Sequence, residues 1–164
     1  MEAAERLLVE HDPYGLTFDQ VATEAGVSRA LVHTYLGDRR GLIDAVQVRV
    51  VGRLDARVAP ALARAAGTEA RLRTLAGEVF AFVTAEQDGW SVLVASGGLD
   101  HPALHGVRAR WCTRLADGRP GTEVAAQAVV AALLMGVGGW VHRGVDVGEV
   151  ADPLLAALRA AHGA

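Results

Sequence analysis

The chain has 164 residues, a formal net charge of −3 and 51% hydrophobic against 21% charged residues. This composition excludes a disordered chain, and the length suits one core or a small module joined to a larger one. A single cysteine, Cys112, excludes an internal disulfide bond, and the first residues lack the basic and apolar runs of a signal peptide. Both features favour a cytoplasmic protein.

Capping signals predict a short helix that begins after Thr17. The Thr17 hydroxyl can accept a hydrogen bond from the first turn, and Gln20, three residues later, completes a capping box. The helix is expected to run to Ala25 and to end at Gly26, because glycine readily adopts the left-handed backbone that closes a helix.

A second short helix is predicted over residues 29–36. Ser28 can cap its start, Gly37 is a candidate for a left-handed end, and Asp38 can cap a third helix. Two short helices joined by a tight turn form a helix-turn-helix, whose second helix enters the major groove of DNA. The sequence therefore predicts a helix-turn-helix over about residues 17–36.

The second of these helices has one core face and one polar face. Val32 and Leu36 should hold it on the core, whereas Arg29 at its first position suits a bidentate contact with guanine. The outward face consists of Arg29, Ala30, His33 and Thr34, and Arg39 and Arg40 beyond the helix can hold phosphates. A tight helical hairpin that does not bind DNA is the alternative that these residues alone leave open.

Periodic apolar residues predict further helices and no strands, so the expected fold class is all-α. The first of these helices, over residues 42–58, is amphipathic and is expected to end near Pro60. The others are expected over residues 68–87, 102–116, 123–142 and 147–161.

The helix expected over residues 123–142 is apolar on almost every side. It is long enough to span a bilayer, but its alanine and glycine content and Gln127 favour burial against protein. We expect it to form a dimeric four-helix bundle with the last helix, because so small a chain cannot cover it on all sides. Internal packing in a monomer is the alternative. The predicted dimer residues are Val130, Leu134, Val137, Leu154 and Leu158.

Aromatic and sulfur-containing residues on different body helices can converge on a pocket for a small molecule. The candidates are Phe80, Trp90, Trp111, Cys112, Met135 and Trp140. Simple filling of the core is the alternative for each of them. Few charged residues lie in these helices, which favours an apolar or weakly polar ligand, although His142 and Arg143 can address an acidic group.

One pair of histidines has the spacing of a metal site. His101 and His105 lie four residues apart beside Asp100, but Pro102 favours a helix start at this point instead. The sequence has no nucleophile elbow, phosphate-binding loop or recognisable pair of catalytic carboxylates. We therefore expect no metal, no cofactor and no enzymatic activity.

The stretch "LTFDQVATEAGVSRALVHTYLGDRRGLIDAV" resembles the N-terminal signature of the TetR family of bacterial transcriptional regulators. The similarity covers roughly residues 3–50 and is closest at Leu16-Thr17, Val21-Ala22 and the run Ala-Gly-Val-Ser that ends at Ser28. It implies an Ω-shaped, all-α homodimer. Residues 1–46 would form the helix-turn-helix domain, and residues 47–164 a helical domain for effector binding and dimerisation.

The resemblance also implies roles for individual residues in DNA binding. Thr17 would anchor its helix on phosphate, and Arg39 would hold the DNA backbone beyond the second helix. Arg29, Ala30 and Leu31 would face bases, and His33, Thr34 and Tyr35 would touch phosphates or base edges. The implied function is that of a repressor released from a palindromic operator by a small apolar effector.

The N-terminal module departs from the family pattern in several places. His33 stands where tyrosine is usual and Leu36 where phenylalanine is usual, and the basic arm of many relatives is missing. Residues 1–50 contain five arginines and eight acidic residues, a net charge of −3, although phosphate neutralisation drives most DNA binding. The alternative function is a dimeric small-molecule-binding or protein-interaction module that has lost DNA binding.

Overall fold

The computed structural model describes residues 2–10, 16–118 and 121–160, and in these ranges it contains helices and no strands. The all-α prediction is confirmed. The helices are α1 (Glu2–Glu10), α2 (Phe18–Ala25), α3 (Arg29–Leu36), α4 (Arg39–Arg64), α5 (Gly67–Ala85), α6 (Gln87–Ala95), the 3₁₀ helix η1 (Gly98–Asp100), α7 (Pro102–Ala116), α8 (Thr122–His142) and α9 (Val147–Ala160).

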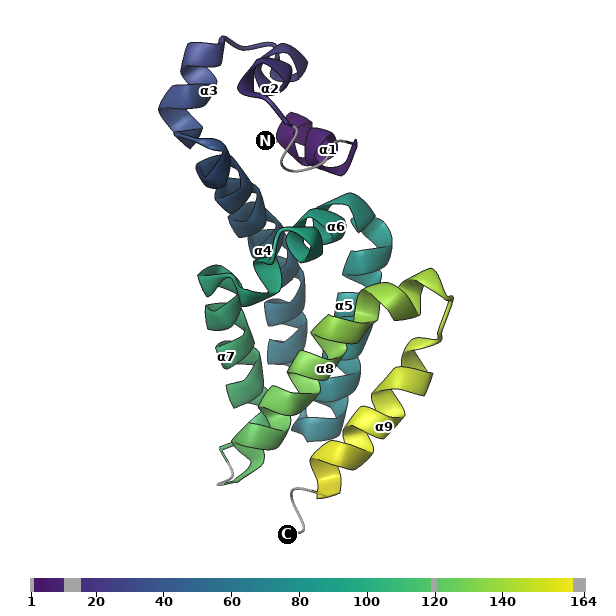
Figure 1. Cartoon of the computed structure of the whole chain (residues 1–164). Helices are drawn as coiled ribbons and strands as arrows, with labels where there is room; N and C mark the ends of the chain where they lie inside the picture. Colours follow the sequence, from purple (N-terminus) through teal and green to yellow (C-terminus); the bar gives the residue numbers. More distant parts are fainter. Residues whose placement is uncertain (1, 11–15, 119–120, 161–164) are drawn as a thin grey trace.

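Helices α1 to α3 form a small head at one end of the molecule, and α4 runs from this head into a larger helical body (Figure 1). The predicted capping box at the start of α2 is present. The Gln20 N–H donates to Thr17 Oγ1 at 3.3 Å, and the Thr17 N–H donates to Gln20 Oε1 at 2.8 Å. Buried Leu16 and Val21 flank the box and hold α2 on the head.

The turn between α2 and α3 depends on Gly26, which has the predicted left-handed backbone (φ 65°, ψ 32°). Ser28 then caps α3 by accepting from the Leu31 N–H at 3.2 Å, and Asp38 caps α4 by accepting from the Gly41 N–H at 2.8 Å. Gly37 departs from its prediction: its φ is positive, but its ψ of −96° lies outside the left-handed helical region. Gly37 therefore turns the chain from α3 into α4 without forming the left-handed C-cap that the sequence predicts.

Replacing Gly26 with alanine is expected to destabilise the protein by about 1–2 kcal/mol, because an L-residue in the left-handed region brings its Cβ close to the backbone. No atom outside the immediate backbone lies within 4 Å of the new methyl group, so no clash with a neighbour adds to this backbone strain. Urea unfolding followed by circular dichroism measures it. The matched change Gly52→Ala, at a helical glycine with equally open surroundings, should stabilise the protein by roughly 0.5–1 kcal/mol.

Helix α4 is longer than predicted, since it passes through Pro60 and ends at Arg64. The proline ring removes one N–H donor to the carbonyl of Ala56, and both residues lie on the exposed side, where water can replace that donor. Along the opposite side, a stripe with four-residue spacing that includes Val50, Leu54 and Val58 is fully buried. The free energy gained by burying this stripe outweighs the tendency of proline to end the helix.

Helix α6 was not predicted. The periodic pattern indicated one helix over residues 68–87, but α5 ends at Ala85 and the backbone bends at Glu86 (φ −127°, ψ 51°) before α6 begins. No side chain caps the start of α6, and Gly89 lies in its first turn. The sequence therefore contains no start signal, and tertiary packing determines this helix.

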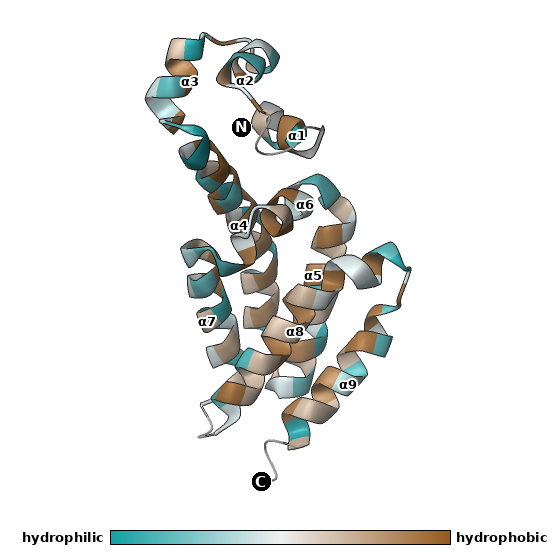
Figure 2. Cartoon of the chain, in the orientation of Figure 1, coloured by the Kyte–Doolittle hydropathy of each residue, from teal (hydrophilic) through white to brown (hydrophobic). Residues whose placement is uncertain are grey.

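The core of the body surrounds α5, which contacts α4, α7, α8 and α9. Leu72, Leu75 and Val79 of α5 are fully buried, as are Leu133 and Val137 of α8. Hydrophobic residues extend along most of α8 and into its neighbours in the body (Figure 2). This packing sets α8 across the body with one side inward and the other side uncovered.

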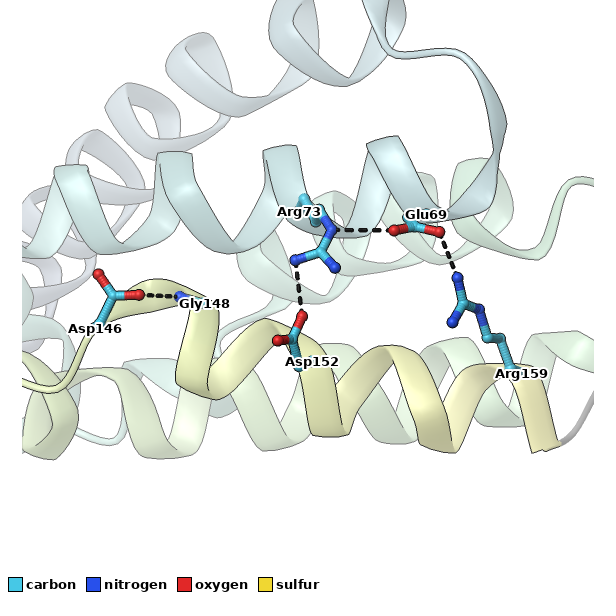
Figure 3. Close-up of polar contacts among 6 residues, drawn as sticks. All are labelled: Glu69, Arg73, Asp146, Gly148, Asp152 and Arg159. Atoms are coloured by element: carbon cyan, nitrogen blue, oxygen red, sulfur yellow. Dashed lines mark hydrogen bonds and ion pairs between the residues drawn. The ribbon is translucent and has the colours of Figure 1, made fainter.

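A network of charged side chains fastens α9 to the outside of α5 (Figure 3). The Arg73 guanidinium donates to Glu69 at 3.2 Å and to Asp152 at 2.8 Å, and Arg159 pairs with the other oxygen of Glu69. Each of these side chains is about half exposed or more, so each pair adds little stability by itself. The buried side of α9, which includes fully buried Leu158, holds this helix on the body.

Candidate DNA-binding surface and effector groove

The outward face of α3 is uncovered, as the sequence predicts for a DNA-reading helix. Val32 is buried at 5% exposure and Leu36 packs against the core, whereas Leu31 is 44% and Tyr35 78% exposed. The remaining predicted contact residues of this helix, which are also exposed, are Arg29, Ala30, His33 and Thr34. These side chains are therefore free of the core and accessible to a partner such as DNA.

Arg29 at the first position of α3 is held by an acidic residue of α2. Its Nη1 donates to Asp19 Oδ2 at 3.0 Å, and both side chains are more than 60% exposed. The pair offsets the unfavourable placement of a cation at a helix N-terminus. A guanidinium has five N–H donors, so this contact leaves Arg29 with donors for a base or phosphate.

His33 and Thr34 also make local contacts. The His33 ring meets Phe18 of α2 edge to face, with ring centroids 4.8 Å apart, and remains exposed. The Thr34 hydroxyl donates to the Ala30 carbonyl at 2.8 Å, which leaves its oxygen as an acceptor. These contacts orient the side chains of His33 and Thr34, which the sequence predicts only to lie on the outward face of α3.

Two predicted phosphate contacts flank the helix-turn-helix. Thr17 is exposed beside the start of α2, where N–H groups at a helix N-terminus favour an anion. Arg39 also makes a contact within the head, since its Nη2 donates to the Leu16 carbonyl. This contact ties the start of α4 to the start of α2, and Arg40 beside it is exposed.

A groove of about 520 Å³ lies between α6 and the second half of α8. Among the six predicted pocket residues, only Trp90 and Met135 line it. Its apolar walls are Val83, Trp90, Val94, Leu99, Leu134, Met135 and Val141, and Gln87, Ser91 and His142 supply polar groups. None of the described residues that line this groove carries a carboxylate or a guanidinium, so the groove suits an apolar molecule with a hydrogen-bonding end.

Of the other four predicted pocket residues, Phe80, Trp111 and Cys112 are buried in the core, and partly buried Trp140 packs against it. Phe80 and Trp140 stack with centroids 6.3 Å apart and ring planes 7° from parallel. Trp111 is 1% exposed and its Nε1 donates to Asp55 Oδ1 at 3.0 Å, which fastens α7 to α4. These side chains do not line the groove, because composition does not reveal which direction a side chain takes from its helix.

Cys112 is also buried, at 3% exposure. Burial raises the pKa of its thiol, while the charge of Arg108 opposes this effect and that of Glu123 adds to it. Because the thiolate is the reactive form, the folded protein should react with a disulfide reagent at neutral pH at least about tenfold more slowly than the urea-unfolded protein. Absorbance of the released thiol measures both rates. Full modification of the folded protein within the mixing time would contradict this placement.

Four of the five predicted dimer residues are buried within the chain. Val130, Val137 and Leu158 are 0% and Leu134 3% exposed, and Leu154 is half-buried. The prediction is wrong for these buried residues because α8 is apolar on all sides, so its sequence pattern does not distinguish the inward side. On the uncovered side, Val124, Ala128, Ala132, Met135 and Gly139 form what is called the exposed α8 face, and the polar residues Gln127 and His142 of this helix are also exposed.

By its length and composition, helix α8 could cross a membrane. Within its most apolar stretch of 18 residues, 33% is buried in the protein. The exposed α8 face accounts for much of the remainder, with Val124 at 73% and Met135 at 74% exposure. Small residues between these two side chains allow another helix to approach closely.

His101 caps α7 instead of joining a metal cluster. Its Nδ1 accepts from the Ala103 N–H at 3.1 Å, and its Nε2 lies 2.8 Å from Asp44 Oδ1 on α4. Within the described residues, no group of three or more potential metal ligands comes together. The helix start that Pro102 indicated is confirmed.

Comparisons with known proteins agree with this arrangement. Residues 1–46 match the family model of bacterial regulatory proteins of the tetR family. The comparison with curated proteins gave no match.

Several solved structures have the same fold. FadR from Bacillus subtilis, in complex with stearoyl-CoA, gives a TM-score of 0.76 over 96% of this chain and 94% of its own, at 16% identity. The fatty acid degradation regulator FadR from Bacillus halodurans gives 0.74 over 96% and 91%, at 17% identity. A tetR-family transcriptional regulator from Streptomyces coelicolor gives 0.74 over 97% and 78%, at 23% identity. At such identities the likeness establishes the fold.

Proposed function

Because the chain belongs to the TetR family of bacterial transcriptional regulators, we propose that it is a repressor that leaves its operator when a small apolar molecule binds. The observation that most supports this is the uncovered α3, held at the end of a long α4 whose other half lies in the body. The proposed activity is binding without catalysis, in the cytoplasm where the operator lies.

We assign DNA binding to residues 1–46. In this proposal Arg29, Ala30 and Leu31 meet base edges in the major groove, as the first turn of a recognition helix does. His33, Thr34 and Tyr35 reach phosphates or further bases, and Thr17 and Arg39 hold the DNA backbone. The net negative charge of this module makes one copy a weak binder, so affinity depends on two modules reading two half-sites.

Residues 47–164 then serve effector binding and dimerisation. The exposed α8 face is the proposed dimer contact, since it is apolar, built of small residues and more uncovered than a soluble monomer usually leaves a helix. The outward side of α9 extends this surface through Pro153, Ala156 and Ala157, which are exposed. Two copies of each helix would form a four-helix bundle.

The groove between α6 and α8 is the proposed effector site. Its volume falls in the range of small-molecule pockets, and its lining is apolar with a few polar groups. The fold is shared with the FadR regulator from Bacillus subtilis, whose structure contains stearoyl-CoA, and this supports an apolar effector here. An effector in the groove would displace α6, tilt α4 and change the separation of the two recognition helices.

This mechanism requires that the effector bind the released conformation more tightly than the DNA-binding conformation. The difference in binding free energy, which is the coupling between the two sites, is typically about 1–3 kcal/mol. The test is a titration of labelled operator in the presence of apolar compounds, with fatty acids and their CoA thioesters in the panel. A releasing compound should weaken operator binding roughly 5–150-fold. If calorimetry detects a bound compound while operator affinity never changes, the effector mechanism fails.

A further inference from the structure

One arginine of α4 connects the head with the body through two carboxylates. Arg53 Nη2 and Nη1 donate to the two oxygens of Glu5 on α1 at 2.5 and 3.2 Å, which is a bidentate contact. Arg53 Nε donates to Glu86 Oε2 at 2.6 Å, at the junction of α5 and α6. This cluster of Glu5, Arg53 and Glu86, called the Arg53 bridge, joins three elements at one guanidinium.

The Arg53 bridge is more enclosed than the other ion pairs among the residues that the structure describes. The side chain of Glu5 is 13% exposed, and those of Arg53 and Glu86 are 30% and 32% exposed. Burial by itself lowers the pKa of the Arg53 guanidinium, but hydrogen bonds and charges from Glu5 and Glu86 outweigh it and raise that pKa. Loss of one partner would leave a partly buried charge unpaired, which proteins tolerate poorly.

Helix α6 packs directly on this bridge. A Cβ added to Gly89, in the first turn of α6, would lie 2.6 Å from Glu5 Oε1 and 3.0 Å from Arg53 Nη2. It would also lie 3.3 Å from a methyl group of Val50 on α4. Glycine at this position therefore lets the α6 backbone contact the bridge, and any movement of α6 changes the space that the bridge occupies.

The opposite side of the same short helix lines the groove. Gln87, Trp90 and Ser91 of α6 face it, and Gly138 of α8 lies beneath the Trp90 indole. A Cβ at position 138 would lie 2.9 Å from Trp90 Nε1, a distance that requires the indole or the helix to move. A helix of nine residues thus contacts the groove on one side and the Arg53 bridge on the other.

We propose that Arg53 is the positioning residue through which occupancy of the groove reaches the DNA-binding domain, by way of α6 and Glu5. The inference rests on the proposed function and adds the residues that transmit the signal. With the groove empty, Arg53 holds α1 against α6 and α4 and keeps the head in one orientation. Displacement of α6 separates Glu86 and Gly89 from Arg53, releases Glu5 and frees the head to reorient.

The structure supplies a substitution that imitates a filled groove without a ligand. Gly138→Ala pushes on Trp90 from the floor of the groove, whereas the control Gly77→Ala adds the same methyl group to α5 with nothing within 4 Å. Arg53→Gln breaks the bridge. Its control is Arg57→Gln, one turn further along α4, which removes a 2.7 Å pair with Glu78 of α5 and does not involve α1.

Two readouts are measured in a double-mutant cycle: operator affinity and hydrogen exchange of the α1 amides. Gly138→Ala should lower operator affinity at least about fivefold and speed exchange in α1. In the Arg53→Gln background both quantities should already be altered, and Gly138→Ala should add almost nothing. In the Arg57→Gln background, Gly138→Ala should keep its full effect.

Equal effects of Gly138→Ala in the wild-type and Arg53→Gln backgrounds would overturn the proposal, as would no effect in either. If Arg53→Gln does not fold, Glu86→Gln, which weakens only the α6 side of the bridge, takes its place in the cycle. Exchange of α1 needs no operator. A protein that selects no DNA sequence would therefore lose the proposed function while exchange still decides the role of Arg53.

Discussion

Replacing Arg29 and His33 together with alanine should abolish measurable operator binding while leaving the protein folded. Arg29 is the first residue of α3, and a bidentate contact between arginine and guanine contributes about 1–3 kcal/mol of discrimination. His33 lies one turn further along the same exposed side. Both are long polar side chains on a helix that the core holds through Val32.

The cost to folding should be small, since among the described residues Arg29 pairs with exposed Asp19, and His33 meets Phe18 edge to face. Exposed pairs of this kind contribute about 0–1 kcal/mol. Fluorescence anisotropy of labelled operator measures binding, and thermal unfolding checks the fold. The control Arg64→Ala removes one positive charge from the far end of α4 and should leave affinity unchanged. Unaltered affinity in the double variant would mean that α3 does not read DNA.

Replacing Ala132 with arginine should convert the proposed dimer into a monomer and remove operator binding with it. Ala132 is exposed, lies in the middle of the exposed α8 face and does not line the groove. Close packing of two α8 helices there would bury an unpaired charge, which costs about 3–5 kcal/mol. That cost corresponds to roughly 10²–10⁴ in the dimerisation constant.

Sedimentation measures the mass, which is 17.1 kDa for one chain. The matched change Ala109→Arg places the same charge on an exposed position of α7 and should leave the mass of the dimer intact. A variant at Ala132 that remains a dimer would exclude the exposed α8 face as the contact. A monomer that still binds operator tightly would separate dimerisation from DNA reading.

Local signals explain why the head could be predicted from the sequence. The capping side chains of Thr17, Ser28 and Asp38 act within three residues of themselves, and Gly26 is required by its own backbone angles. Such features are determined by neighbours in the chain, so their residue types reveal them. The exposed face of α3 followed from the same helix boundaries.

The body was harder to predict because its important features depend on contacts between distant segments. Helix α6 has no cap and is defined by packing against α1 and α4, which lie far from it in sequence. The inward side of α8 could not be predicted from an apolar sequence, and Val130 and Val137 were therefore assigned to the wrong surface. Trp111 had been expected in a pocket, but its hydrogen bond to Asp55 places it in the core.

Selection of bound sequences from a random pool of double-stranded DNA by the purified protein tests the central claim most directly. The account predicts enrichment of a palindrome whose half-sites lie about one helical turn or a multiple of it apart, because two recognition helices read it with two-fold symmetry. If no sequence is enriched even at low salt, α3 does not serve as a DNA-reading helix. The protein would then be a small-molecule-binding or protein-interaction module.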